Sequence, residues 1–199
     1  MALLGQKRQR TGATALRRRF RAGIALVVAA SLVAPAFGQA AAAQPGALEY
    51  AVKANYLYKF APFVEWPARV FASAASPFNI CVLGADPFGR ALDEAVRGQR
   101  IEGRAISVRR LRSAADTGDC HVLYLGRQPP QAADQTLKAL RGSPVLTVTD
   151  AGQGVQGGIV HFVLVEGRVR FSLDPNQAQA NGIVLSSKLR ALAAPALAR

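Results

Sequence analysis

Short apolar runs alternate with helical patterns through the middle of the chain, and this alternation constrains the fold more than any other feature. The apolar runs, each bounded by turn residues, lie at 79–84, 105–110, 120–125 and 145–148. A helical pattern opens at Asp86-Pro87 and stops at Gly98, and another runs from Pro130 to Leu140. Strands joined by helices through short loops are typical of a mainly parallel sheet covered on both faces.

The C-terminal third follows a different pattern. Runs at 159–165 and 168–173 are joined by Glu166-Gly167, which is a two-residue hairpin signal. A final helical segment would pack through Ile183, Leu185, Leu189 and Leu192. The sequence therefore predicts an α/β protein: a three-layer α/β/α sandwich with a mainly parallel sheet and a C-terminal antiparallel hairpin.

An aromatic helical pattern at 49–64 precedes the first strand. Its apolar face consists of Val52, Tyr56, Leu57, Phe60, Phe63 and Val64. Lys53 and Lys59 lie off this face. We expect Trp66-Pro67 to end the helix, because proline disfavours helical geometry in the residue before it.

The first 43 residues have the three zones of a secretory signal peptide. A basic stretch ends at Arg21, an apolar run covers 24–37, and small residues fill 38–43. The apolar run is shorter than a bilayer-spanning helix needs, and Pro35 interrupts it. We therefore predict a signal peptide at 1–43, a linker at 44–48, a folded domain at 49–194, a tail at 195–199 and a periplasmic location. A retained membrane anchor is the alternative.

The formal net charge of +13 overstates the basicity of the folded part. Seven of the 25 basic residues lie in the leader, which has no acidic residue, so 18 basic residues face 12 acidic ones in the remainder. The arginine-rich run at 104–112 fits a half-exposed strand, in which Ile106 and Val108 alternate with polar positions. An exported protein meets no genome, so we expect no nucleic acid as partner. Lipid headgroups or an acidic protein surface are better targets for this run.

The two cysteines, Cys81 and Cys120, are candidates for a disulfide in an oxidising compartment. Cys81 lies in the first predicted strand and Cys120 at the start of the third. In a doubly wound sheet of strand order 2-1-3-4 these strands are neighbours, about 4.8 Å apart, which a disulfide can span. The alternative is a pair of reduced, buried thiols. With no further cysteine and only two histidines, we expect no metal site.

The sequence contains motifs that could indicate catalysis or cofactor binding, but the segments around them do not fit those functions. Gly152 to Gly157 reads G-x-G-x-x-G, but a strand follows it, whereas a dinucleotide site needs a helix there. His121 and His161 lack a nearby nucleophile and acid in a recognisable pattern, so we interpret both as packed or locally hydrogen-bonded side chains. We therefore predict no cofactor and no enzymatic activity.

Several segments together resemble the YfiR family over about residues 48–193. The matching segments are 50–60, 63–67, 80–89, 120–125, 157–162 and 186–189. The resemblance implies a periplasmic protein that represses a membrane-bound diguanylate cyclase by binding its periplasmic sensor part. Related domains also precede histidine kinases, so the partner can differ.

The leading hypothesis is thus a non-enzymatic regulator whose partner is the periplasmic part of an inner-membrane sensor protein. A homodimer and peripheral membrane contact are left open. Among the aromatics, Tyr58 and Trp66 are the predicted partner contacts, because partly exposed aromatic side chains anchor interfaces. The rival hypothesis is a small-ligand sensor with its pocket at the carboxyl ends of the strands. An uncharacterised enzyme of the cell envelope is a weaker third.

Overall fold

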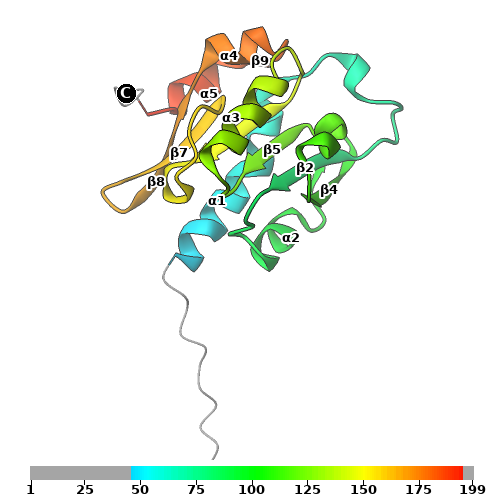
Figure 1. The fold of residues 1–199 in the computed structure, drawn as a ribbon. Coiled ribbons are helices and arrows are strands. Elements are labelled where there is room, and N and C mark those ends of the chain that lie inside the picture. Colours follow the sequence, from blue (N-terminus) through cyan, green and yellow to red (C-terminus); the bar gives the residue numbers. More distant parts are fainter. Residues whose placement is uncertain (1–45, 195–199) are drawn as a thin grey trace, which may run out of the picture. The chain divides into compact units, whose positions relative to one another are not determined.

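The computed structural model describes residues 46–194 (Figure 1). The predicted signal peptide, the first part of the linker and the tail lie outside the described residues. The α-helices are α1 (Ala47–Lys59), α2 (Arg90–Val96), α3 (Pro130–Ala139), α4 (Pro175–Ala180) and α5 (Ser187–Leu192). Short 3₁₀ helices are η1 (Ala61–Phe63), η2 (Ala68–Val70), η3 (Ala114–Asp119) and η4 (Ala151–Gln153).

A seven-stranded sheet forms the centre of the described domain, in the order β3-β4-β2-β5-β6-β7-β8. Its strands are β2 (Phe78–Leu83), β3 (Arg100–Ile101), β4 (Arg104–Leu111), β5 (Val122–Leu125), β6 (Leu146–Asp150), β7 (Val160–Val165) and β8 (Arg168–Leu173). Four pairs are parallel: β4 with β2, β2 with β5, β5 with β6, and β6 with β7. The two outer pairs, β3 with β4 and β7 with β8, are antiparallel. The α/β class is confirmed, and β4, β2, β5 and β6 follow the strand order expected from the sequence.

Alternate residues of the central strands enter two separate hydrophobic clusters. Ile80 and Val82 of β2 pack with residues of α1, α2 and α5, whereas Cys81 and Leu83 pack with residues of α3. Figure 1 shows α3 in front of the strands and α1 behind them. Because successive side chains point to opposite faces of a strand, both faces of the central sheet are buried, and helices pack against both.

The first helix is shorter than expected, and one of its lysines is buried. Helix α1 ends at Lys59, not at Trp66, and η1 follows. Proline at position 62 explains the early end, because in an α-helix its ring would clash with the carbonyl of Tyr58 four residues before it. Lys53, expected off the packing face, is 1% exposed.

The structure also corrects the start of the second helix. Helix α2 begins at Arg90, with Gly89 at its N-cap in a positive-φ conformation (φ 50°) that an α-helix cannot continue through. The Asp86 carboxylate instead accepts the N–H groups of Phe88 and Gly89. Asp86 therefore caps the turn before the helix, not the helix itself.

Two very short strands join the beginning of the domain to its end. Strand β1 (Val64–Glu65) pairs antiparallel with β9 (Val184–Leu185), and the N–H of Ser186 donates to the carbonyl of Phe63. The sequence analysis did not predict this pair. Helix α4 was also missed; its N-cap Asp174 accepts the N–H of Gln177.

Candidate functional site

A buried ion cluster fixes α1 to the carboxyl end of β6. The Lys53 ammonium donates to both carboxylate oxygens of Asp150, at 2.8 Å (Oδ1) and 2.7 Å (Oδ2), and it also contacts the carboxylate of Glu49. Lys53 is 1% exposed, Asp150 is fully buried and Glu49 is 20% exposed. A lysine and an aspartate at this depth require each other, because either alone would be an uncompensated buried charge.

Further hydrogen bonds complete this cluster and tie the glycine-rich loop to it. The Tyr124 hydroxyl donates to Asp150 Oδ2 (2.9 Å), and the N–H of Gly152 donates to Oδ1 (2.9 Å). Burial, and then the negative charge of Asp150, raise the pKa of Tyr124, so its hydroxyl stays a donor. The residues of the G-x-G-x-x-G motif thus form η4 and a loop that leads into a strand, with Gln153 donating to the Tyr50 hydroxyl (2.6 Å).

The crevice in which doubly wound sheets bind their ligands is closed here. That crevice lies at the carboxyl ends of β2 and β5, where the strand order reverses. The loops that leave these strands are bonded to each other, Ala85 N–H to the Arg127 carbonyl (3.0 Å) and Gly126 N–H to the Leu83 carbonyl (2.8 Å). A Cβ on Gly126 would overlap the carbonyl of Ala85. At the position where the ligand-sensor hypothesis predicted a pocket, the two loops therefore pack closely against each other through their backbones.

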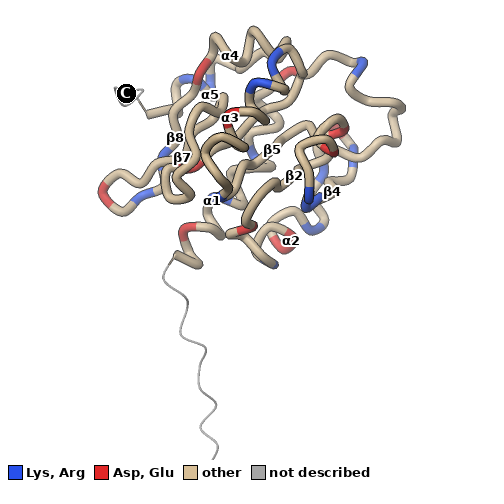
Figure 2. Tube along the Cα trace, in the orientation of Figure 1, with Lys and Arg blue, Asp and Glu red and all other residues tan. Residues whose placement is uncertain are grey.

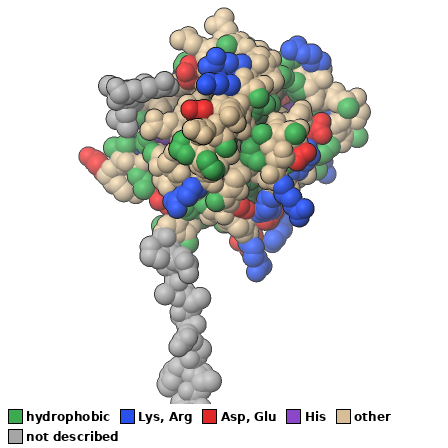
Figure 3. Space-filling model, viewed as in Figure 1, with side chains coloured by type: hydrophobic (Ala, Val, Ile, Leu, Met, Phe, Trp, Pro, Cys, Tyr) green, Lys and Arg blue, Asp and Glu red, His purple; other side chains and the backbone are tan. Residues whose placement is uncertain are grey.

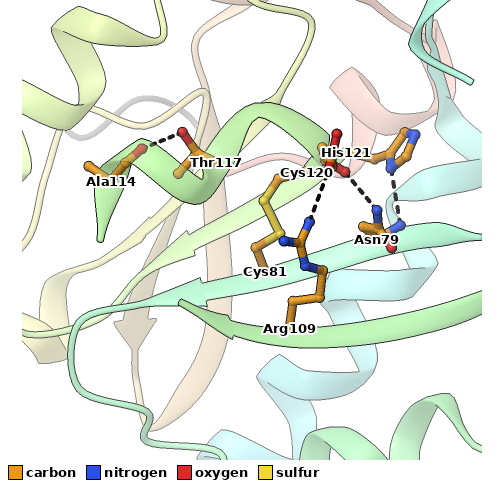
Figure 4. Close-up of a disulfide and its surroundings, with 8 residues drawn as sticks. Asn79, Cys81, Arg109, Ala114, Thr117, Cys120 and His121 are labelled. Atoms are coloured by element: carbon orange, nitrogen blue, oxygen red, sulfur yellow. Dashed lines mark hydrogen bonds and ion pairs between the residues drawn. A yellow bond between two sulfur atoms is a disulfide. The ribbon is translucent and has the colours of Figure 1, made fainter. Parts of the chain in front are cut away.

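The opposite, amino-terminal edge contains the disulfide between Cys81 and Cys120 (Figure 4). The two Cα atoms are 5.8 Å apart. In the sheet Cys81 pairs with Leu123, so the bond is not between directly opposite residues. Cys120 instead lies at the end of η3, just before β5, and the bond joins this turn to the middle of β2.

His121, the next residue, is a buried and neutral histidine. It is 4% exposed and stacks against the rings of Phe71 and Phe78, with centroids 4.5 and 4.8 Å away. Its Nδ1 accepts the N–H of Asn79 (3.0 Å) (Figure 4). Desolvation, and then the positive charge of Arg104, lower the pKa of His121 to about 4. Nε2 is therefore the protonated nitrogen, and this buried N–H has no hydrogen-bond partner among residues 46–194.

A cavity of about 440 Å³ adjoins His121 and the disulfide. Its lining includes Arg69 of η2, Thr117 and Asp119 of η3, and Ser143 before β6. The cavity therefore combines a cation, a carboxylate, two hydroxyl groups and an imidazole beside a cross-linked turn. It lies at the amino ends of the strands, opposite the closed crevice.

The two predicted contact residues lie in different settings. Tyr58 of α1 is half-buried against the core, with the Lys59 ammonium 5.9 Å from its ring centroid. Trp66 is also half-buried and packs edge-on against Phe78 and His121. The indole N–H of Trp66 is buried without a partner in the described residues. The structure thus groups Trp66 with His121 and the disulfide but places Tyr58 on the helix.

Arg104 and Arg110 of β4 are bonded to other parts of the domain; Figure 2 shows basic residues along this strand in blue. Arg110 donates to Asp86 (2.7 Å) and Asp93 (2.7 Å), and these bonds raise the pKa of Arg110 and lower that of Asp93. Arg104 donates to three carbonyls of the 73–76 loop, and its guanidinium lies 3.9 Å from the centroid of the Phe71 ring. Both guanidinium groups are therefore hydrogen-bonded to other parts of the same domain.

Comparison with known proteins agrees with the resemblance noted in the sequence. Residues 50–194 match the sequence model of a family described as YfiR/HmsC-like. The chain belongs to this family. The match begins within α1, runs beyond the end of α5 and includes Lys53, Asp150 and the disulfide.

Within this YfiR/HmsC-like domain, the sequence analysis missed the ion cluster, although two local signals were present. Glu49 and Lys53 are four residues apart on one helix, and Asp150 ends an apolar strand. Across residues 46–194, no three His, Cys, Asp or Glu side chains lie close enough to hold a metal ion. Within the same range, no helix is long and apolar enough to cross a bilayer.

Proposed function

We propose that this protein is a periplasmic regulator that represses a membrane-bound diguanylate cyclase by binding its periplasmic sensor part, without catalysis. Membership of the YfiR/HmsC-like family carries this proposal. The disulfide supports a location outside the cytoplasm, because such bonds persist in oxidising compartments. Repression of this kind requires only different affinities for two conformations of the partner.

The polar interior supports a binding role as well. The most buried charged groups, Lys53 and Asp150, neutralise each other and stabilise the fold. Burial keeps His121 neutral, and it lies between two phenylalanine rings. Lys53 and Asp150 are thus committed to an internal ion pair, and the ring of His121 is packed between aromatic side chains.

Deleting the gene in its native host tests the proposal. We expect intracellular cyclic di-GMP to rise, and to return when the full chain is supplied from a plasmid. Supplying residues 44–199 alone, which lack the predicted signal peptide, should not restore the level. Unchanged cyclic di-GMP on both deletion and overexpression would contradict the assignment to a cyclase.

Small-ligand sensing is a second candidate, favoured by the cavity beside His121. The guanidinium of Arg69 suits a carboxylate, and the Val70, Leu140 and Val145 side chains in the lining suit an apolar body. The only tryptophan, Trp66, packs against His121, so its fluorescence reports on this region. We expect benzoate to change that fluorescence in the wild type and not in His121→Asn. A flat titration in the wild type would count against an aromatic carboxylate as ligand.

A further inference from the structure

The two edges of the seven-stranded sheet differ in how they are covered. Strand β8, at one edge, receives the N–H of Ala194 on the carbonyl of Phe171, so the chain after α5 partly covers it. Strand β4, near the other edge, pairs with β3 through only two of its residues, Arg104 and Ala105. The rest of β4 has no further strand beside it in the described domain.

The hairpin geometry shows which backbone groups of β4 face this open side. The β3–β4 turn contains two residues with positive φ, so Ile101 and Arg104 form the hydrogen-bonded pair that closes it. Alternation along the strand then directs the N–H and C=O groups of Val108 and Arg110 outwards, away from β2. Among residues 46–194 these outward groups have no hydrogen-bond partner.

The side chains of β4 do not block its open side. Arg110 is drawn to Asp86 and Asp93 on one face of the sheet, and Arg109 to Asp119 on the other. Natural edge strands are often protected by charges that project along the edge, but these arginines are bonded back onto the domain. The backbone of β4 is consequently accessible.

A basic groove of about 410 Å³ runs beside this edge, between α2 and β4. Val96, Ile106 and Val108 form its apolar part, and the exposed side chains of Arg97 and Arg100 line its mouth. The acidic residue in its lining, Asp93, is already paired with Arg110. Figure 3 shows basic side chains gathered on this side of the molecule, at the lower right. The groove therefore offers the exposed, positively charged side chains of Arg97 and Arg100 next to unpaired strand backbone.

We propose that the open edge of β4 binds an extended, acidic segment of a partner protein as an added strand. Main-chain hydrogen bonds to Val108 and Arg110 supply affinity, apolar side chains of the segment meet Ile106 and Val108, and its carboxylates meet Arg97 and Arg100. That this segment belongs to the sensor protein rests on the function proposed above. The binding site itself does not.

A peptide that alternates glutamate with valine is the probe, with binding to the full mature chain measured by fluorescence anisotropy. We expect it to bind, more weakly at higher salt, and to shift the NMR amide signals of Val108 and Arg110. The same peptide with an N-methylated backbone, and a lysine-for-glutamate peptide, should not bind. Equal binding of the N-methylated peptide would overturn strand addition, and no binding of the glutamate peptide would overturn the site.

Val108→Pro removes an outward N–H and should weaken peptide binding at least about tenfold, a factor equal to 1.4 kcal/mol. Val169→Pro is the matched control, because Val169 is a partly buried valine on the other edge strand. Because proline at position 108 could also disturb folding, a second variant replaces both exposed arginines, Arg97→Glu and Arg100→Glu. This double variant should lose binding to the glutamate peptide and should bind the lysine peptide instead. Unchanged affinity in both variants would refute the proposal.

Different results would contradict the proposed regulator function and the proposed binding site on β4. Val108→Pro supplied to the deletion strain should leave cyclic di-GMP high if the β4 edge holds the sensor. If wild-type protein restores the level and Val108→Pro does so equally, the edge is not the contact although the regulator role stands. If peptide binding depends on β4 but deletion leaves cyclic di-GMP unchanged, the site stands and its partner is another acidic protein.

Discussion

Replacing Lys53 with methionine should destabilise the domain far more than replacing an exposed lysine. Methionine fills most of the same space, so the loss is electrostatic: Asp150, which is fully buried, keeps Tyr124 and Gly152 as donors but has no cation. Breaking a buried pair by removing one partner costs about 3–5 kcal/mol. For a domain of this size that corresponds to a fall in Tm of roughly 6–20 °C.

Urea unfolding followed by circular dichroism measures this loss, and Lys59→Met is the matched control. Lys59 is exposed on the same helix, with its ammonium over the Tyr58 ring, so its replacement should change stability by less than about 0.5 kcal/mol. Lys53→Met combined with Asp150→Asn should cost less than the sum of the single changes, because it removes both charges. A loss below about 1 kcal/mol for Lys53→Met, or strict additivity in the double variant, would refute the buried-pair reasoning.

Three further predictions concern the amino-terminal edge and α1. The pKa of His121 falls from 6.5 to about 4 on folding, so the unfolded chain binds more protons between these values. Stability should therefore drop by up to about 3 kcal/mol as the pH is lowered from 6.5 to 4, and His121→Asn should abolish that slope in denaturation curves. Replacing Cys81 and Cys120 with alanine should cost about 2–4 kcal/mol, since the bond closes a loop over a separation of 39 residues, and equal urea midpoints would contradict this. Tyr58→Ala and Trp66→Ala should weaken partner binding by about 1–3 kcal/mol in pull-down titrations if they are interface anchors, whereas a loss of folding without a separate binding defect would make them core residues.

The strands and most helices were predictable because their signals are local. Short apolar runs bounded by turn residues mark β2, β5 and β6 within a few residues of where they lie. Neighbouring strands of a doubly wound sheet follow a common order, and that order led to the pairing of Cys81 with Cys120. The end of α1 had a local signal too, Pro62, which the prediction passed over in favour of Pro67.

The ion cluster was not predictable to the same degree, because its decisive contact is not local. Lys53 and Asp150 are 97 residues apart in the sequence. Helical periodicity therefore assigns Lys53 to the solvent-exposed face, because nothing nearby in the sequence reveals its buried partner. The two-residue strands β1 and β9 carry no pattern of their own, since so short a run has no period. The closed crevice likewise depends on two loops that meet only in the folded domain.

The attachments of α1 also determine when the domain can fold. Lys53 bonds to Asp150 across 97 residues, Gln153 to Tyr50 across 103, and Tyr56 packs against Phe171. Contacts this distant in sequence form late and slow down folding. While the chain is being made, its first helix is therefore without its partners until nearly the whole polypeptide has been synthesised. If the protein is exported as proposed, its chain would be threaded through a membrane channel during that interval, before α1 has docked on the rest of the domain.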